Sequence, residues 1–193
     1  MALNIGLISE KRLMQNDEKL MCEYLYAYDE ASINLVPSIP YGWIKINEDV
    51  ELPSSKSQNI GILGFINRNN DLHSYMVKGS VNSDVVIGCF DDFAENKFEK
   101  PRIVLIDNAP THTSAKFEEK KEEWKRKNLY PVNIPKYSPE HNMIEILWRF
   151  IKYKWIDLKA YESFEKLEIE VLRILKNIGS EYRIDFRKEA NAK

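Results

Sequence analysis

The chain has 193 residues, of which 44% are hydrophobic and 30% are charged. This balance is typical of one soluble globular domain that is large enough to bury its own core. Residues 1–100 carry 9 Lys and Arg against 15 Asp and Glu, and residues 101–193 carry 19 against 15, so the two halves have net charges of −6 and +4. A domain that holds DNA tightly by itself is usually strongly basic, so this composition supports only modest affinity for nucleic acid.

Export and membrane insertion are not indicated. No 18 apolar residues occur in a row, and the N-terminus has no basic segment of the kind that starts a secretory leader. The two cysteines, Cys22 and Cys89, have no metal-binding or redox spacing. We therefore expect a cytoplasmic protein with reduced thiols and no membrane partner.

The first half of the chain predicts an antiparallel meander. Residues 1–22 are expected to form a polar lead-in or helix. Apolar and aromatic runs then predict strands, and the Asn-rich segment 67–71 predicts a hairpin turn between the last two of them. The expected strands cover 23–28, 43–46 (a short one), 57–66 and 72–78.

After residue 80 the pattern changes to the period of a helix. Ser83 is expected to cap the first helix, and later segments alternate between strand and helix. The expected elements are strands at 102–106 and 129–134, and helices at 114–127, 143–155 and 163–178. Residues 23–180 would form one domain, and residues 181–193 a disordered tail. Three antiparallel strands followed by alternating helices and strands predict an α/β RNase H-like fold, with a mixed five-stranded sheet and helices on both faces.

Three acidic residues lie in apolar surroundings. Asp29 ends the apolar run 24–28, Asp107 ends the run 103–106, and Glu145 lies among apolar residues of the predicted helix at 143–155. A buried carboxylate costs several kcal/mol unless a cation or hydrogen bonds compensate its charge. If the first and fourth strands are neighbours, Asp29 and Asp107 project into one crevice, and the helix brings Glu145 to it.

Carboxylate oxygens prefer hard cations such as Mg²⁺ or Mn²⁺. Two such ions can activate a water or a 3′-hydroxyl and stabilise the leaving oxygen of a phosphodiester. The spacing of the acidic residues therefore favours phosphodiester chemistry. The alternative is that these carboxylates only cap helices or close turns.

Three ordered motifs resemble the DDE catalytic domain of Tc/mariner-type transposases, and more specifically their bacterial insertion-sequence branch. The resemblance extends from about residue 24 to 154, and the motifs are Tyr28-Asp-Glu-Ala-Ser32, Ile106-Asp-Asn-Ala-Pro-Thr-His112 and Pro135-Lys-Tyr-Ser-Pro-Glu140 followed by Asn142-Met-Ile-Glu-Ile-Leu-Trp148. It implies an RNase H-like fold, two divalent metal ions, and DNA cleavage and strand transfer during transposition. It also implies that Asp29, Asp107 and Glu145 are the catalytic metal ligands.

Further candidate site residues follow from the resemblance and from the positions of residues on the predicted helix, loop and strand. Asn108 and His112 would lie near the active centre, as phosphate contacts or as supports of the metal ligands, although His112 could instead cap a turn. Possible contacts to the DNA backbone are Lys136, Tyr137, Arg149 and Lys152. Glu30 follows Asp29 on the opposite face of the strand, so we interpret it as a solvated or salt-bridged residue.

The resemblance also bears on partners. Such transposases act as homodimers on transposon ends and target DNA, in bacteria at the nucleoid, and they recognise these ends through helix-turn-helix modules. Only 28 residues precede Asp29, so we expect that DNA-binding half to lie on a separate chain or to be missing. Two alternatives stay open: an RNase H-like nuclease that cleaves hybrids or junctions, and an inert remnant that only binds other proteins.

Overall fold

A computed structural model describes residues 23–37, 58–96, 98–135 and 142–186. Its centre is a five-stranded sheet in the order β3-β2-β1-β4-β5. β1 and β2, and β2 and β3, pair antiparallel, whereas β4 runs parallel to both β1 and β5. The strands are β1 (Leu25–Asn34), β2 (Asn59–Asn67), β3 (Leu72–Lys78), β4 (Arg102–Ile106) and β5 (Leu129–Asn133). The predicted mixed sheet is confirmed.

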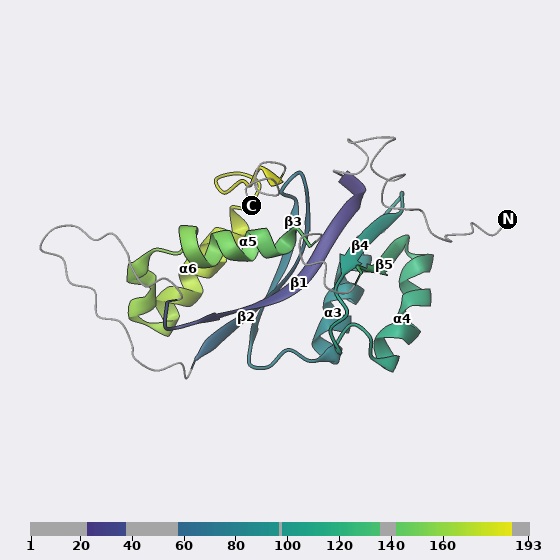
Figure 1. The fold of residues 1–193 in the computed structure, drawn as a ribbon, viewed down its shortest axis with the longest axis horizontal. Helices are drawn as coiled ribbons and strands as arrows, with labels where there is room; N and C mark the ends of the chain where they lie inside the picture. Colours follow the sequence, from purple (N-terminus) through teal and green to yellow (C-terminus); the bar gives the residue numbers. More distant parts are fainter. Residues whose placement is uncertain (1–22, 38–57, 97, 136–141, 187–193) are drawn as a thin grey trace, which may run out of the picture.

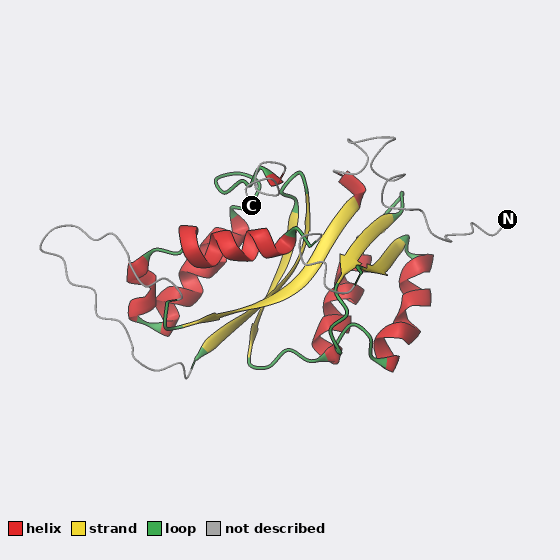
Figure 2. Cartoon of the chain, in the orientation of Figure 1, coloured by secondary structure: helices red, strands yellow, loops and turns green. Residues whose placement is uncertain are grey.

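Helices cover both faces of this sheet (Figures 1 and 2). In the view of Figure 1, α5 and α6 lie on the left and α3 and α4 on the right. The helical segments are α3 (Ser83–Ala94), α4 (Ala115–Arg126), α5 (Ile144–Phe150), the π-helix η2 (Ile151–Trp155), the 3₁₀ helix η3 (Leu158–Glu162) and α6 (Phe164–Lys176). None of the described helices is both long and apolar enough to cross a membrane.

The alternation of side chains along β1 produces two separate cores. Tyr26 and Tyr28 face α3 and α4, in an aromatic cluster with Phe90 and Trp124. Ala27, between the two tyrosines, belongs to the cluster beneath α5 and α6. Successive strand residues point to opposite faces, so the next residue, Asp29, faces the α5 side and Glu30 faces the α3 side.

The helix starts follow local capping rules, with one correction. Ser114 and Ser163 cap α4 and α6, since their side chains accept hydrogen bonds from backbone N–H groups three residues later. Our assignment of Ser83 as the cap of α3 was wrong: Asn82, one residue earlier, accepts from the N–H of Val85. Both residue types cap well, so the sequence left a choice between neighbours.

Three further predictions need correction. β1 runs to Asn34 instead of ending at Tyr28, because pairing with β2 continues from Tyr26 to Asn34. The helix expected at 143–155 changes from α to π after Phe150. The tail expected from residue 181 is ordered at its start, where Ile184 and Phe186 are buried in the α5 side core. The short strand at 43–46 lies outside the described residues.

Candidate active site

Asp29 and Asp107 lie where β1 and β4 part from each other. The last parallel pair is Ala27 with Leu105, and each aspartate follows two residues later on its own strand. β4 ends at Ile106, so Asp107 starts the following loop. Asp29 does not end its strand as we had expected: it lies within β1, opposite Gly64 of β2. The predicted adjacency of the first and fourth strands is confirmed.

Helix α5 places Glu145 over the same part of the sheet. Ile144, Leu147 and Trp148 are buried against the sheet, as the apolar stripe predicted. Glu145 lies in the first turn and faces outward. It lines a cleft of about 480 Å³ whose walls also include Asp29, Glu30, Arg149 and Lys152. Asp107 is not part of this lining.

The charges of the three acidic residues interact. Burial raises the pKa of Asp29 to about 7; a backbone hydrogen bond at Glu30 opposes the rise, and the charges of Glu30, Asp107 and Glu145 add to it. Like charges held close together favour the protonated form. A nearby positive charge would therefore stabilise the ionised form of Asp29. Lys152 lies close enough to interact with it, although burial lowers the pKa of this lysine and Asp29 only partly reverses that effect.

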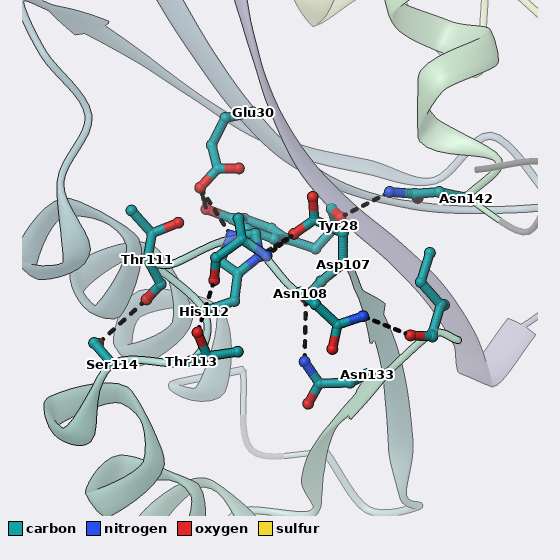
Figure 3. A network of polar contacts seen from close by, with 12 residues as sticks. Tyr28, Glu30, Asp107, Asn108, Thr111, His112, Thr113, Ser114, Asn133 and Asn142 are labelled. Carbon is teal, nitrogen blue, oxygen red and sulfur yellow. Dashed lines mark hydrogen bonds and ion pairs between the residues drawn. The ribbon is translucent and has the colours of Figure 1, made fainter. Parts of the chain in front are cut away.

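His112 joins Asp107 to Glu30, as Figure 3 shows. Its Nδ1 lies 2.6 Å from Oδ1 of Asp107, and its Nε2 lies 2.9 Å from Oε1 of Glu30. The imidazole is fully buried. Burial alone would lower its pKa, but the hydrogen bonds and negative charges of Glu30 and Asp107 outweigh burial and raise it. Each ring nitrogen thus faces a carboxylate oxygen, and a protonated ring would donate to both.

The turn after Asp107 is held by its own hydrogen bonds. The N–H of Ala109 donates to Oδ1 of Asp107 at 2.9 Å. Asn108 donates to the carbonyl of Ile134, and Asn133 donates to the carbonyl of Asp107, so the ends of β4 and β5 are joined twice (Figure 3). The side-chain nitrogen of Asn108 therefore donates to a backbone carbonyl, and the ring of His112 lies between two carboxylates.

The carboxylates do not form a closed metal cage. Across residues 23–37, 58–96, 98–135 and 142–186, no three His, Cys, Asp or Glu side chains are arranged to hold an ion. The chemistry of the donors nevertheless fits a hard divalent cation: the groups offer carboxylate oxygens, and burial together with the charges of the neighbouring acids raises the pKa of Asp29.

The other predicted residues divide into two groups. Arg149 and Lys152 line the cleft beside Glu145, on the shared helix face that their spacing predicted. Lys136 and Tyr137 lie outside the described residues. We expected Glu30 to be solvated or salt-bridged, and its carboxylate contacts His112. The sequence did not indicate this partner, because 82 residues separate the two side chains.

Comparisons with known proteins agree with this architecture. The fold resembles the Mos1 transposase in its paired-end complex with the left transposon end (TM-score 0.60, 16% identity, 89% of this chain and 52% of that chain). It also resembles the mariner Mos1 paired-end complex with Mg (TM-score 0.61, 15% identity, 93% and 54%). A third match is the isolated catalytic domain of the Mos1 mariner transposase (TM-score 0.55, 14% identity, 89% and 77%).

These likenesses show the fold, and this chain spans about half the length of the first two Mos1 chains. No curated protein matches the sequence. A family model described as DDE superfamily endonuclease matches residues 24–168, which include Asp29, Asp107 and Glu145. Because this match covers most of the chain, the protein belongs to the DDE superfamily endonuclease family.

Proposed function

We propose that this chain cleaves DNA phosphodiester bonds with divalent metal ions and joins the freed ends to target DNA, as the catalytic part of a transposase. One observation carries the proposal: Asp29 has its pKa raised to about 7 by burial and by the charges of neighbouring acids that include Asp107 and Glu145. The Mos1 complexes support it, since that transposase is found with a left transposon end, with Mg and in a strand transfer complex.

In this proposal Asp29, Asp107 and Glu145 hold two Mg²⁺ or Mn²⁺ ions. When bound, such ions activate the attacking water or 3′-hydroxyl and stabilise the leaving oxygen. The chain itself contributes position and charge. Asp107 is held by the Ala109 N–H and by His112 through the same oxygen, Oδ1. This leaves Oδ2 as the oxygen to present to a metal.

The basic residues of the cleft would guide the DNA backbone. Arg149 and Lys152 lie on the same helix as Glu145 and line the cleft with it. Phosphate contacts fix the register of a protein on DNA without reading its sequence. We expect these two side chains to bring the scissile phosphate toward the carboxylates, and we expect a homodimer on paired ends, with end recognition by a helix-turn-helix partner.

The test is metal-dependent nicking of a supercoiled plasmid by the purified chain. Asp107→Asn keeps the shape of the side chain but removes its charge. Nicking with Mn²⁺ or Mg²⁺ should fall by more than about 100-fold, because loss of a metal ligand should cost more than loss of a residue that only supports a ligand, which usually costs about 10- to 100-fold. Glu119→Gln, an exposed change on α4, should leave the rate unchanged. Circular dichroism should show the same fold in all three proteins.

Other results would contradict the proposed mechanism or support one of the two alternative functions. Undiminished nicking by Asp107→Asn would remove Asp107 from the mechanism. Faster cleavage of an RNA/DNA hybrid than of duplex DNA would favour another RNase H-like nuclease. Absence of both cleavage and calorimetric Mn²⁺ binding would indicate an inert remnant.

A further inference from the structure

We propose that Glu30 is a positioning residue for the metal site, and that it acts on Asp107 through His112. The inference rests on the proposed function, because it assigns a task to Asp107 as a metal ligand. It concerns a carboxylate on the opposite face of β1 from Asp29. The chain Glu30–His112–Asp107 therefore joins β1 to the loop that follows β4.

The His112 ring cannot reorient easily. It is fully buried; it packs edge-on against Tyr28, with ring centroids 5.5 Å apart, and at a tilt against Phe117, with centroids 6.0 Å apart. Interiors are packed closely enough to resist rotation of such a ring. The packing and the two carboxylates at its nitrogens therefore fix its orientation.

Glu30 holds the ring from the side opposite Asp107. Its Oε1 lies 2.9 Å from Nε2 of His112, and Nδ1 of the same ring lies 2.6 Å from Oδ1 of Asp107. The ring is rigid, so the carboxylate that fixes one nitrogen also fixes the position of the other. A carboxylate should anchor the ring more strongly than an amide, because hydrogen bonds to an ionised acceptor are the stronger ones.

The carboxylate of Glu30 is held by side chains on the α3 side of the sheet. Its Oε1 lies 2.9 Å from Nε2 of His112, and the hydroxyl of Tyr28 lies 3.5 Å from the same oxygen. Tyr28 faces the aromatic core, on the side of β1 away from α5 and Glu145. Residue 30 also contributes to the wall of the cleft with Glu145, so the experiment separates action through His112 from a direct effect in the cleft.

The experiment compares Glu30→Gln with Glu119→Gln, the same substitution at an exposed position of α4. Mn²⁺ binding is measured by calorimetry, and nicking is measured against both metal and DNA concentration. We expect Glu30→Gln to weaken Mn²⁺ binding by about 10-fold or more, within the range known for outer supports of metal ligands. The KM for DNA at saturating metal should stay unchanged, and so should every property of Glu119→Gln.

A second pair of variants separates action through His112 from other roles. In His112→Asn the amide nitrogen can replace Nδ1 and still donate to Asp107, but nothing reaches Glu30. Adding Glu30→Gln to His112→Asn should therefore cause no further loss of Mn²⁺ affinity. An equal loss in both backgrounds would overturn the inference, and so would a raised KM for DNA, or a lower melting temperature with unchanged metal binding.

The failures of the two proposals are distinguishable. If the wild-type chain binds Mn²⁺ but does not nick DNA, the proposed function fails, while the ratio of Mn²⁺ affinities still tests Glu30. If the wild-type chain nicks DNA and Glu30→Gln binds Mn²⁺ equally well, the inference fails and the proposed function stands.

Discussion

At the scale of single residues, the most unusual group is the carboxyl of Asp29, because its surroundings in the fold disfavour the charged form. Asp29 is half-buried beside three other acidic side chains, and its pKa rises to about 7 from an ordinary value of 3.8. Its folded-state pKa lies above its unfolded value, so the proton it keeps on folding stabilises the protein fully below about pH 4. That stabilisation is lost as the pH rises through about 7.

Asp29→Asn should therefore stabilise the metal-free protein at high pH while destroying its metal site. A shift of this size corresponds to at most about 4 kcal/mol, and solvent screening should reduce it to about 1–2 kcal/mol. The measurement is urea unfolding with a chelator at pH 4 and pH 8. The variant should gain stability relative to the wild type between the two pH values, whereas Glu119→Gln should not. If the difference in unfolding free energy between Asp29→Asn and the wild type were the same at pH 4 and pH 8, the pKa of Asp29 would not be raised in the folded protein.

At the scale of elements, the position of Glu145 depends on how closely α5 approaches the sheet. Trp148 of α5 packs over Gly64, the residue opposite Asp29 in β2. A methyl group at Gly64 would lie 3.2 Å from Cη2 of Trp148 and 3.3 Å from the His73 carbonyl oxygen. The absence of a side chain at this position allows the helix to sit where Glu145 and Asp29 share a cleft.

Gly64→Ala should push α5 outward by a few tenths of an ångström and lower metal-dependent nicking by about 10-fold, since small misplacements of catalytic groups are costly. Overpacking should also cost about 1–3 kcal/mol of stability. The matched control is Gly88→Ala on α3, where an added methyl meets nothing within 4 Å. It should stabilise the helix by about 0.5–1 kcal/mol without changing the rate. Unchanged nicking by Gly64→Ala would show that the spacing of α5 does not matter.

The sequence predicted those elements whose signal is local. Alternating and apolar runs placed β2 to β5 within a few residues, and the apolar stripe of α5 was confirmed residue by residue. It could not predict the π turn at Ile151–Trp155, because that turn depends on distant packing. The wider turn lets Phe150 and Trp155, five residues apart, contact each other, and Trp155 then packs on Tyr182.

At the scale of the whole molecule, the acidic residues could be predicted but their surroundings could not. Asp29 and Asp107 each follow a buried run, and that pattern is visible in the sequence. The bridge from Asp107 through His112 to Glu30 exists only after β1 and β4 have paired. Contacts between distant segments are set by the topology, so a single sequence gives no signal for them.

The net charge of the whole molecule also affects how the chain should bind DNA. Its net charge is −2, so overall attraction to phosphate is absent, and binding must come from local positive groups. Arg149 and Lys152 provide such a patch beside the carboxylates of the cleft. We expect weak binding to duplex DNA that does not depend on its sequence, with a Kd of about 10⁻⁴ to 10⁻⁶ M near physiological salt.

Replacing both Arg149 and Lys152 by Gln should reduce the slope of log K against log salt by about 2, since each lost phosphate contact removes about one released counterion. The matched control replaces Lys116 and Lys125 by Gln on α4, across the sheet from α5. It removes the same charge, so an effect of net charge alone would lower the affinity of both double variants equally. Fluorescence anisotropy across a salt series distinguishes the two cases. Equal losses would mean that DNA does not enter the cleft beside Glu145, and a loss confined to the Arg149 and Lys152 variant would place the phosphates next to the carboxylates.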